Sequence, residues 1–170
     1  MLAADGVDVR GVERFVEAMR KCGAIPKVLA PTAAGTRSGG SGGQKAVDRS
    51  FTSVASVLYD AVVVPSGLQS VETLGNDGYA LRFVTEAYKH LKAVAAYGAG
   101  IELLRKAGIE ELLANGRDVV AAAGVVSTTA AEDDLSDQFF EDFATALAKH
   151  RAWERETDSV SAGRKPCRYH

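Results

Sequence analysis

The 170-residue sequence predicts a single α/β domain in which helices cover both faces of a mostly parallel sheet. Short runs of valine and alanine, typical of strands buried on both faces, alternate with longer segments whose apolar residues recur every three or four positions. Neighbouring parallel strands must be joined by crossover connections, and these place the helices on the faces of the sheet. Hydrophobic residues make up 46% of the chain and charged residues 25%, which excludes a wholly disordered chain.

The first third of the chain predicts two short strands around one helix. Residues 2–4 are expected to form the end of a buried strand that begins upstream. Asp8 can then cap a helix that ends at Gly23. A second strand is expected over residues 26–30, and the glycine-rich residues 35–43 predict a flexible loop.

The rest of the chain predicts three more strands, each followed by a turn or a helix. The expected strands cover residues 60–65, 92–97 and 119–126, the last with Gly124 inside it. Gly67 turns the chain after the first of them. Helices are expected over residues 76–91, from 101 to a stop at Gly108, and from 133 to about 153.

The order of these elements resembles a flavodoxin-like three-layer sandwich with a mostly parallel central sheet. In such sheets ligands bind beyond the carboxyl ends of the strands, where the strand order switches. Three turns point to that place, over residues 5–8, 65–68 and 97–100. We therefore expect any functional site of this domain to lie where these turns meet.

The same turns carry a resemblance to the DJ-1/PfpI superfamily of class I glutamine-amidotransferase-like domains. Four longer segments look more specifically like the C-terminal domain of large-subunit catalases, and they are residues 2–8, 56–65, 86–92 and 148–155. The resemblance covers roughly residues 2–156. It implies one flavodoxin-like domain over residues 1–156, followed by a polar tail over 157–170 that we expect to be disordered.

The resemblance also implies that the chemical site of the superfamily is vacant in this chain. Members with chemistry place a cysteine on the strand-to-helix turn, where the helix N-terminus lowers the thiol pKa. Here that position is Gly98, a vacated nucleophile elbow. Asp8 matches the acidic position beside the thiol, and its simpler interpretation is a helix N-cap. We expect no catalytic residue in this chain.

Other candidate residues are better explained by structural roles. Cys22 falls at the C-terminal end of a helix, where the dipole disfavours a thiolate. Ser66 lacks the Gly-x-Ser-x-Gly context of a nucleophilic serine, and no histidine lies on the three turns. His90 and His150 are each expected to close a helix, and His170 is terminal.

Ion and nucleotide sites are not predicted either. Four acidic residues lie close together in the sequence, Glu132, Asp133, Asp134 and Asp137. Their spacing is not that of a cation-binding loop, and they are expected in the first turns of the last helix, where they complement its dipole. The glycine-rich loop is not followed by Gly-Lys-Ser/Thr, so it is not a P-loop. A net charge of −2 argues against a nucleic-acid partner, and no apolar run approaches the ~20 residues that cross a bilayer. We expect no metal in this chain.

The resemblance implies a non-catalytic domain of a larger parent. That parent would disproportionate hydrogen peroxide at a tyrosine-ligated haem within a homotetramer, so the haem is expected in the parent and no cofactor in this chain. The domain would contact the catalase body and sister subunits, and support their stability and packing. A second implied role is ATP-independent chaperone activity toward unfolding proteins.

Two alternatives of other classes remain open from the sequence. The first is a DJ-1/PfpI-type enzyme acting as a glyoxalase, amidase or peptidase, against which Gly98 is the discriminating feature. The second is a module that binds a flavin or nucleotide in the crevice at the strand switch, which rests on fold analogy alone.

Overall fold

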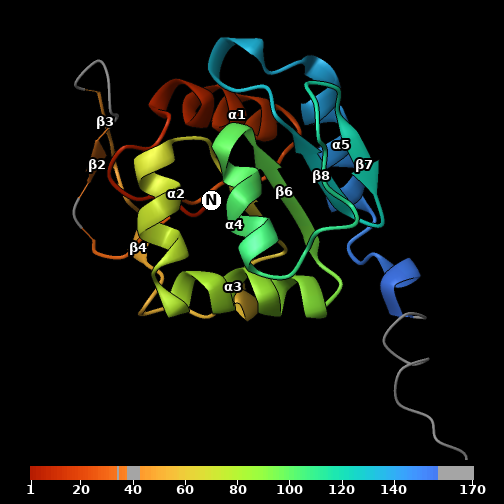
Figure 1. Ribbon diagram of the computed structural model, residues 1–170, viewed down its shortest axis with the longest axis horizontal. Helices are drawn as coiled ribbons and strands as arrows, with labels where there is room; N and C mark the ends of the chain where they lie inside the picture. The colour runs from red at the N-terminus through yellow and green to blue at the C-terminus, as the bar shows by residue number, and fades with distance from the viewer. Residues whose placement is uncertain (34, 38–42, 157–170) are drawn as a thin grey trace, which may run out of the picture.

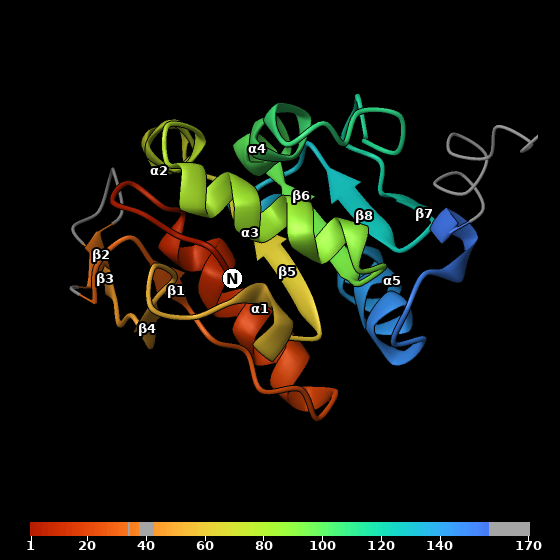
Figure 2. The same cartoon turned by 90° about the horizontal axis from the view of Figure 1, so that it is seen from below.

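The computed structural model describes residues 1–33, 35–37 and 43–156, and these form a three-layer α/β sandwich (Figures 1 and 2). The middle layer is a sheet with strand order β5-β6-β8-β7. Strands β5 (Ala61–Val64), β6 (Ala93–Tyr97) and β8 (Val125–Thr128) run parallel, whereas β7 (Val120–Ala122) pairs antiparallel with β8. The predicted fold class, a mostly parallel sheet between helices, is confirmed.

Alternate side chains of each strand pack on opposite faces of the sheet. Val62 and Val64 of β5 pack with α2 (Leu68–Gly75), α3 (Gly78–Lys89) and α4 (Ile101–Lys106). Val63 points to the other face, where α1 (Val9–Lys21) and α5 (Asp137–Ala148) lie (Figure 2). Burial on both faces explains why the strands are continuous apolar runs rather than alternating ones.

Helix α1 has the ends that the sequence predicts. The Asp8 carboxylate oxygen Oδ1 accepts a hydrogen bond from the Gly11 N–H at 2.9 Å, and so caps the helix. Cys22 is the C-cap, and Gly23 follows with φ of +82°. Phe15 of α1 packs against three aromatic rings of α5, with centroids 5.3 to 6.2 Å away, which are those of Phe139, Phe140 and Phe143.

The segment over residues 2–4 forms a single parallel bridge, between Leu2 and Leu29, and not the end of a strand as expected. The Leu2 N–H donates to the Val63 carbonyl at 2.9 Å, and the Ala3 N–H donates to the Leu29 carbonyl at 2.9 Å. Asp5 and Gly6 then turn the chain before regular pairing can extend. The segment nevertheless connects the small parallel pair of β1 (Leu29–Ala30) and β4 (Arg49–Ser50) to the main sheet.

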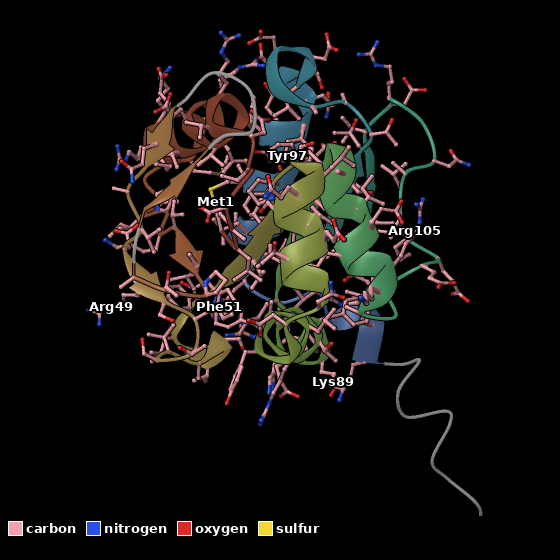
Figure 3. All side chains as sticks on the ribbon, turned by 60° about the vertical axis from the view of Figure 1, so that its left-hand side comes forward. Met1, Arg49, Phe51, Lys89, Tyr97 and Arg105 are labelled. Carbon is pink, nitrogen blue, oxygen red and sulfur yellow. The ribbon has the colours of Figure 1, made fainter. Side chains whose placement is uncertain are left out.

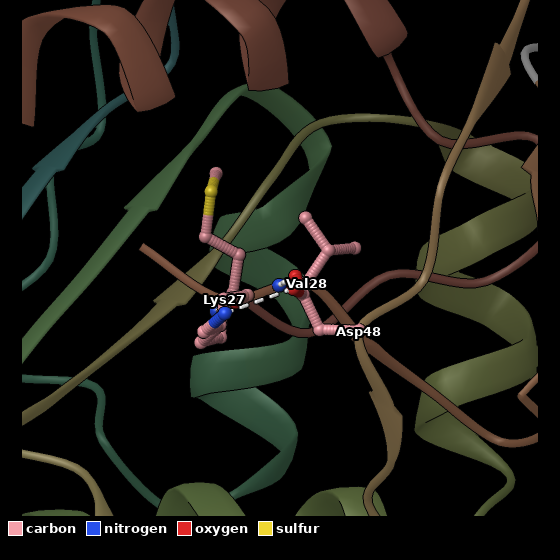
Figure 4. Close-up of polar contacts among 4 residues, drawn as sticks. Lys27, Val28 and Asp48 are labelled. Atoms are coloured by element: carbon pink, nitrogen blue, oxygen red, sulfur yellow. Dashed lines mark hydrogen bonds and ion pairs between the residues drawn. The ribbon is translucent and has the colours of Figure 1, made fainter. Parts of the chain in front are cut away.

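The second predicted strand, over residues 26–30, is shortened to the two residues of β1. Pro26 has no N–H to donate. The Val28 N–H donates to the Asp48 carboxylate at 2.7 Å instead of to a strand, and Lys27 forms an ion pair with the same carboxylate at 3.2 Å (Figure 4). Although partial burial opposes it, these contacts lower the pKa of Asp48 below its usual value.

Part of the predicted glycine loop is regular structure. Strand β2 (Thr36–Arg37) lies within residues 35–43, and it pairs antiparallel with β3 (Gln44–Lys45), which begins directly after them. The flexible loop expected between them falls largely on residues 38–42, outside the described residues, as does the tail expected over 157–170.

The strand predicted over residues 119–126 is wrong, because β7 and β8 form a hairpin there. Val120 pairs with Ser127, and Ala122 pairs with Val125. Ala123 and Gly124 form the two-residue turn, with φ of +45° and +74°. Hairpin turns of this kind need positive φ at both central residues, so Gly124 marks a turn and not a strand interior.

Three helices differ from the prediction. Helix α2 was not predicted as a helix, since only a turn was expected at Gly67. Helix α3 starts at Gly78 and not at residue 76, because the Asp77 carboxylate caps it by accepting from the N–H groups of Tyr79 and Ala80. The last predicted helix, 133–153, is divided into α5 and two 3-10 turns, over Glu132–Asp134 and Trp153–Arg155.

Candidate functional site

The three predicted turns meet at the carboxyl ends of the parallel strands, which we call the carboxyl edge. The Asp8 N–H donates to the Ser66 carbonyl at 2.9 Å, which joins the first turn to the second. The Ser66 hydroxyl Oγ accepts from the Ala99 N–H at 3.2 Å, which joins the second turn to the third. The expected convergence of these turns is confirmed, whereas a functional site at this edge stays a prediction.

Gly98 begins the turn between β6 and α4 and has no room for a side chain. Its φ is +54°, in the left-handed region that favours glycine. A Cβ atom placed on Gly98 would lie 2.4 Å from the Ser66 Oγ and 2.8 Å from the Ala131 Cβ. Both distances are shorter than ordinary van der Waals contact, so Ser66 and Ala131 occupy the space that a side chain at residue 98 would need.

Asp8 is buried at this edge, with 8% of its surface exposed. One carboxylate oxygen caps α1 through the Gly11 N–H. The other lies so close to Gly11 that a Cβ on that residue would be 2.1 Å from it. The structural interpretation of Asp8 as an N-cap is therefore confirmed, and a glycine at residue 11 is a condition for this arrangement.

Tyr97 is the residue at this edge that the sequence analysis did not single out. Its side chain is fully buried (Figure 3), and its ring packs edge-on against Phe139 with centroids 5.8 Å apart. Within the described part of the chain its hydroxyl has no hydrogen-bond partner. Burial raises the pKa of Tyr97 well above its usual value, and the nearby charge of Asp8 raises it further. Tyr97 is thus a neutral phenol and not a base.

The one available signal for Tyr97 was its place in the sequence. It is the last residue of an otherwise apolar strand and directly precedes Gly98. Periodicity marks such a residue as core, but it does not reveal that the hydroxyl would be buried without a partner.

The remaining candidates lie elsewhere. Cys22 is exposed at the far end of α1, and His90 is the C-cap of α3. His150 follows the end of α5 with φ of +65°, whereas His170 lies outside the described residues. Among the described residues, then, the carboxyl edge holds neither a thiol nor an imidazole.

The acidic residues were expected together in the first turns of the last helix, but they do not form one group there. Asp133 and Asp134 belong to the 3-10 turn before α5, and only Asp137 lies in its first turn. Asp133 lies 3.6 Å from Arg10, and Asp134 forms an ion pair with Arg117. Over residues 1–33, 35–37 and 43–156 no group of three or more histidine, cysteine or acidic side chains is placed to hold a metal ion. No helix in the same residues is long and apolar enough to span a membrane.

Comparison with known proteins assigns the family. The sequence matches the family model of the C-terminal domain found in long catalases over residues 1–157. The chain belongs to this family.

Curated relatives of this catalase C-terminal domain are themselves catalases. It is 62% identical to Catalase HPII of Mycobacterium avium, covering 95% of this chain and 23% of that protein. It is 35% identical to Catalase HPII of Pseudomonas aeruginosa, covering 92% of this chain and 20% of that protein. For Catalase-1 of Neurospora crassa the identity is 30%, with 94% and 23% covered. The chain thus spans about a fifth of the length of the curated relatives it matches.

Solved structures place the catalase C-terminal domain in the DJ-1-like fold. The ThiJ/PfpI domain protein of Brachyspira murdochii has a TM-score of 0.76 at 18% identity, covering 87% of this chain and 94% of that one. DJ-1beta of Drosophila melanogaster has a TM-score of 0.71 at 18% identity, covering 95% and 94%. Identities this low show the fold and carry no activity.

Proposed function

We propose that this domain is non-catalytic and that it supports the stability and subunit packing of a parent catalase. The observation that carries the proposal is the filled space at Gly98. On this proposal Gly98 is the vacated nucleophile elbow of the superfamily and Asp8 is the residual acidic position. A thiol at residue 98 would displace Ser66, whose hydroxyl joins two of the three turns.

The other groups at the carboxyl edge support the same proposal. Tyr97 stays neutral, and one Asp8 oxygen is engaged in capping α1. The Ser66 hydroxyl contacts a backbone N–H, with no histidine of the described residues at this edge to activate it. We propose that the parent disproportionates hydrogen peroxide at a haem held by the other four-fifths of its polypeptide, and that its subunits form a homotetramer.

The enzyme alternative is tested with the purified 170-residue chain. We expect no turnover of methylglyoxal, amide or ester substrates above buffer, because nucleophilic catalysis needs an activated side chain and Gly98 has none. Thiol-dependent turnover that disappears in a Cys22→Ser variant would overturn the non-catalytic proposal and assign the activity to the exposed thiol.

The stabilising role is tested in the full-length catalase. We expect that deleting residues 1–156 lowers the temperature of irreversible inactivation while the activity per haem at low temperature stays unchanged. A second variant, Phe139→Ala, weakens the fold of the domain without deleting it, and we expect a smaller shift in the same direction. Unchanged inactivation in both variants, at equal haem content, would contradict the proposal.

A second proposed role is ATP-independent capture of unfolding proteins. Apolar side chains on the surface favour it, because Ile25, Val57 and Leu58 are each at least 70% exposed. We expect the chain to reduce light scattering from a heated client enzyme more than an equal mass of an inert protein does. Equal scattering with the two proteins would leave only the role within the parent.

A further inference from the structure

A groove of about 640 Å³ lies at the edge of the sheet opposite the carboxyl edge. It is formed where α1 and α5 end and where the chain approaches β1 and β5, and we call it the amino-edge groove. In Figure 2 the arrow of β5 rises from the side of the molecule where α1 ends. Most of the residues that line it are apolar by type, and they include Phe15, Met19, Pro26, Tyr59, Phe143 and Leu147.

Two large apolar side chains that line this groove are unusually exposed to solvent. Ile25 is 82% exposed and Leu58 is 70% exposed, and both line the groove. Val57, next to Leu58 in sequence, is 72% exposed. Exposed apolar side chains beside an apolar groove are typical of a surface that another protein segment covers.

The backbone at residue 1 directs any preceding polypeptide to this groove. Met1 lines the groove. Its nitrogen donates to the Lys27 carbonyl at 2.6 Å, and its carbonyl accepts from the Leu29 N–H at 2.8 Å, so its position is fixed from both sides. In the long catalases that give the family its name this domain is C-terminal, so in those proteins the preceding polypeptide leads into the position that corresponds to the start of the matched region, residue 1.

We propose that the amino-edge groove is the docking surface for the catalase body, whose apolar side chains close to the junction at residue 1 fill it. This inference rests on the proposed function. The charges at the groove favour an apolar occupant over a strongly charged one, because Lys27 is already paired with Asp48, and the remaining carboxylate and imidazole side chains of the lining, Asp60 and His150, are one acid and one base. More than three quarters of each matched relative lies outside the shared region, so the body supplies enough polypeptide to cover the groove.

Hydroxyl-radical footprinting tests this proposal directly. The full-length catalase and the 170-residue chain are labelled under the same conditions, and oxidation is read at single residues by mass spectrometry. We expect oxidation of Ile25 and Leu58 to be severalfold lower in the full-length protein. Leu68 and Tyr79, which are 82% and 63% exposed outside the groove, are the internal controls and should be oxidised equally in both proteins.

Matched variants of the full-length protein supply the second measurement. Ile25→Asp with Leu58→Asp places two charges in the proposed interface, whereas Leu68→Asp with Tyr79→Asp changes equally exposed positions outside the groove. We expect the groove variant to inactivate roughly tenfold or more faster on heating, since each lost apolar contact of this size weakens association by about tenfold. The control variant should inactivate at the parental rate.

The outcomes separate this inference from the proposed function. If deleting the domain destabilises the catalase while Ile25 and Leu58 stay fully oxidised in the full-length protein, the groove is not the docking surface, although the stabilising role holds. If deletion has no effect, the stabilising role fails, and protection of the groove would still show docking. Protection that appears in the 170-residue chain as its concentration rises would mean that a second copy fills the groove, and would overturn the proposal.

Discussion

At residue 98 the backbone conformation and the neighbouring side chains both require a residue without a side chain, which is glycine. The left-handed φ disfavours any L side chain, and Ser66 and Ala131 leave no volume for one. The resemblance identified residue 98 as the position that lacks the cysteine of the superfamily. The sequence could not show that other side chains occupy the space of that cysteine. One of the side chains that occupy this space is Ala131, which comes from a distant part of the chain.

Replacing Gly98 by alanine should therefore destabilise the domain. We expect the free energy of unfolding to fall by about 1 to 3 kcal/mol, from the positive φ and the close contact with Ser66. In a double-mutant cycle, Ser66→Gly should recover part of this loss, because it removes both nearby atoms of that side chain. Gly116→Ala is the control, since a Cβ there meets nothing within 4 Å. Additive effects in the cycle, measured by chemical denaturation, would show that Ser66 does not crowd residue 98.

Tyr97 should make the domain sensitive to alkaline pH. Burial and the charge of Asp8 raise its pKa in the folded state, whereas the unfolded chain ionises near pH 10. The unfolded state thus loses a proton first, and stability falls as pH rises above about 10. In Tyr97→Phe this contribution disappears, so urea denaturation should show a shallower loss between about pH 9.5 and 11.

The control for this measurement is Tyr79→Phe, whose side chain is exposed. It should keep the parental pH dependence. At neutral pH Tyr97→Phe should be as stable as the parent or more stable by up to about 1 kcal/mol, because an unpartnered buried hydroxyl is removed. A loss of 2 kcal/mol or more, on the order of a lost buried hydrogen bond, would indicate that the hydroxyl has a partner.

At the scale of the elements, local signals decided what could be predicted. Helix α1 was predicted at both ends, since Asp8 caps it with a side chain and a glycine follows its C-cap. Helix α2 was missed because its N-cap, Gly67, has no side chain to give a capping signal. The β7–β8 hairpin was missed because two short apolar segments, joined without a polar residue, have the same pattern as one continuous strand.

The turn of this hairpin gives a paired prediction. Gly124→Ala should lower stability by about 1 to 3 kcal/mol, because φ is positive and the new Cβ would lie 2.6 Å from that of Ala152. Ala123→Gly should raise stability by up to about 1 kcal/mol, because φ at this residue is also positive. Opposite signs in chemical denaturation are the expected result. Equal destabilisation by both changes would mean that the turn is not as described.

At the scale of the molecule, the two faces of the sheet hold separate apolar clusters, one with α2, α3 and α4 and one with α1 and α5. They share strands β5, β6 and β8, so the loss of either cluster would leave one face of these strands exposed. The sequence predicted the layers, because buried parallel strands need helices on both faces. It could not predict the amino-edge groove, which depends on how the ends of two helices pack against each other.

We expect the domain to unfold in one cooperative transition in which both faces take part. Leu74→Ala and Phe139→Ala lie on opposite faces and are both fully buried, so each should lower the free energy of unfolding by about 2 to 5 kcal/mol. Circular dichroism and the fluorescence of Trp153 should report the same midpoint in each variant. Two separate transitions in either variant would show that the layers unfold independently.

The bridge at Leu2 also determines how the domain responds to mechanical load. Its segment is hydrogen-bonded to Val63 on one side and to Leu29 on the other, in the interior of the extended sheet and not at a free margin. A pull on residue 1 that runs parallel to this segment would load these bonds in shear, so that they would break together rather than one after another. Resistance to such a pull is set by the rate of unfolding. If a catalase body moved or unfolded on heating, the hydrogen bonds of this segment to Val63 and Leu29 would therefore have to break before residue 1 could be pulled away from the sheet.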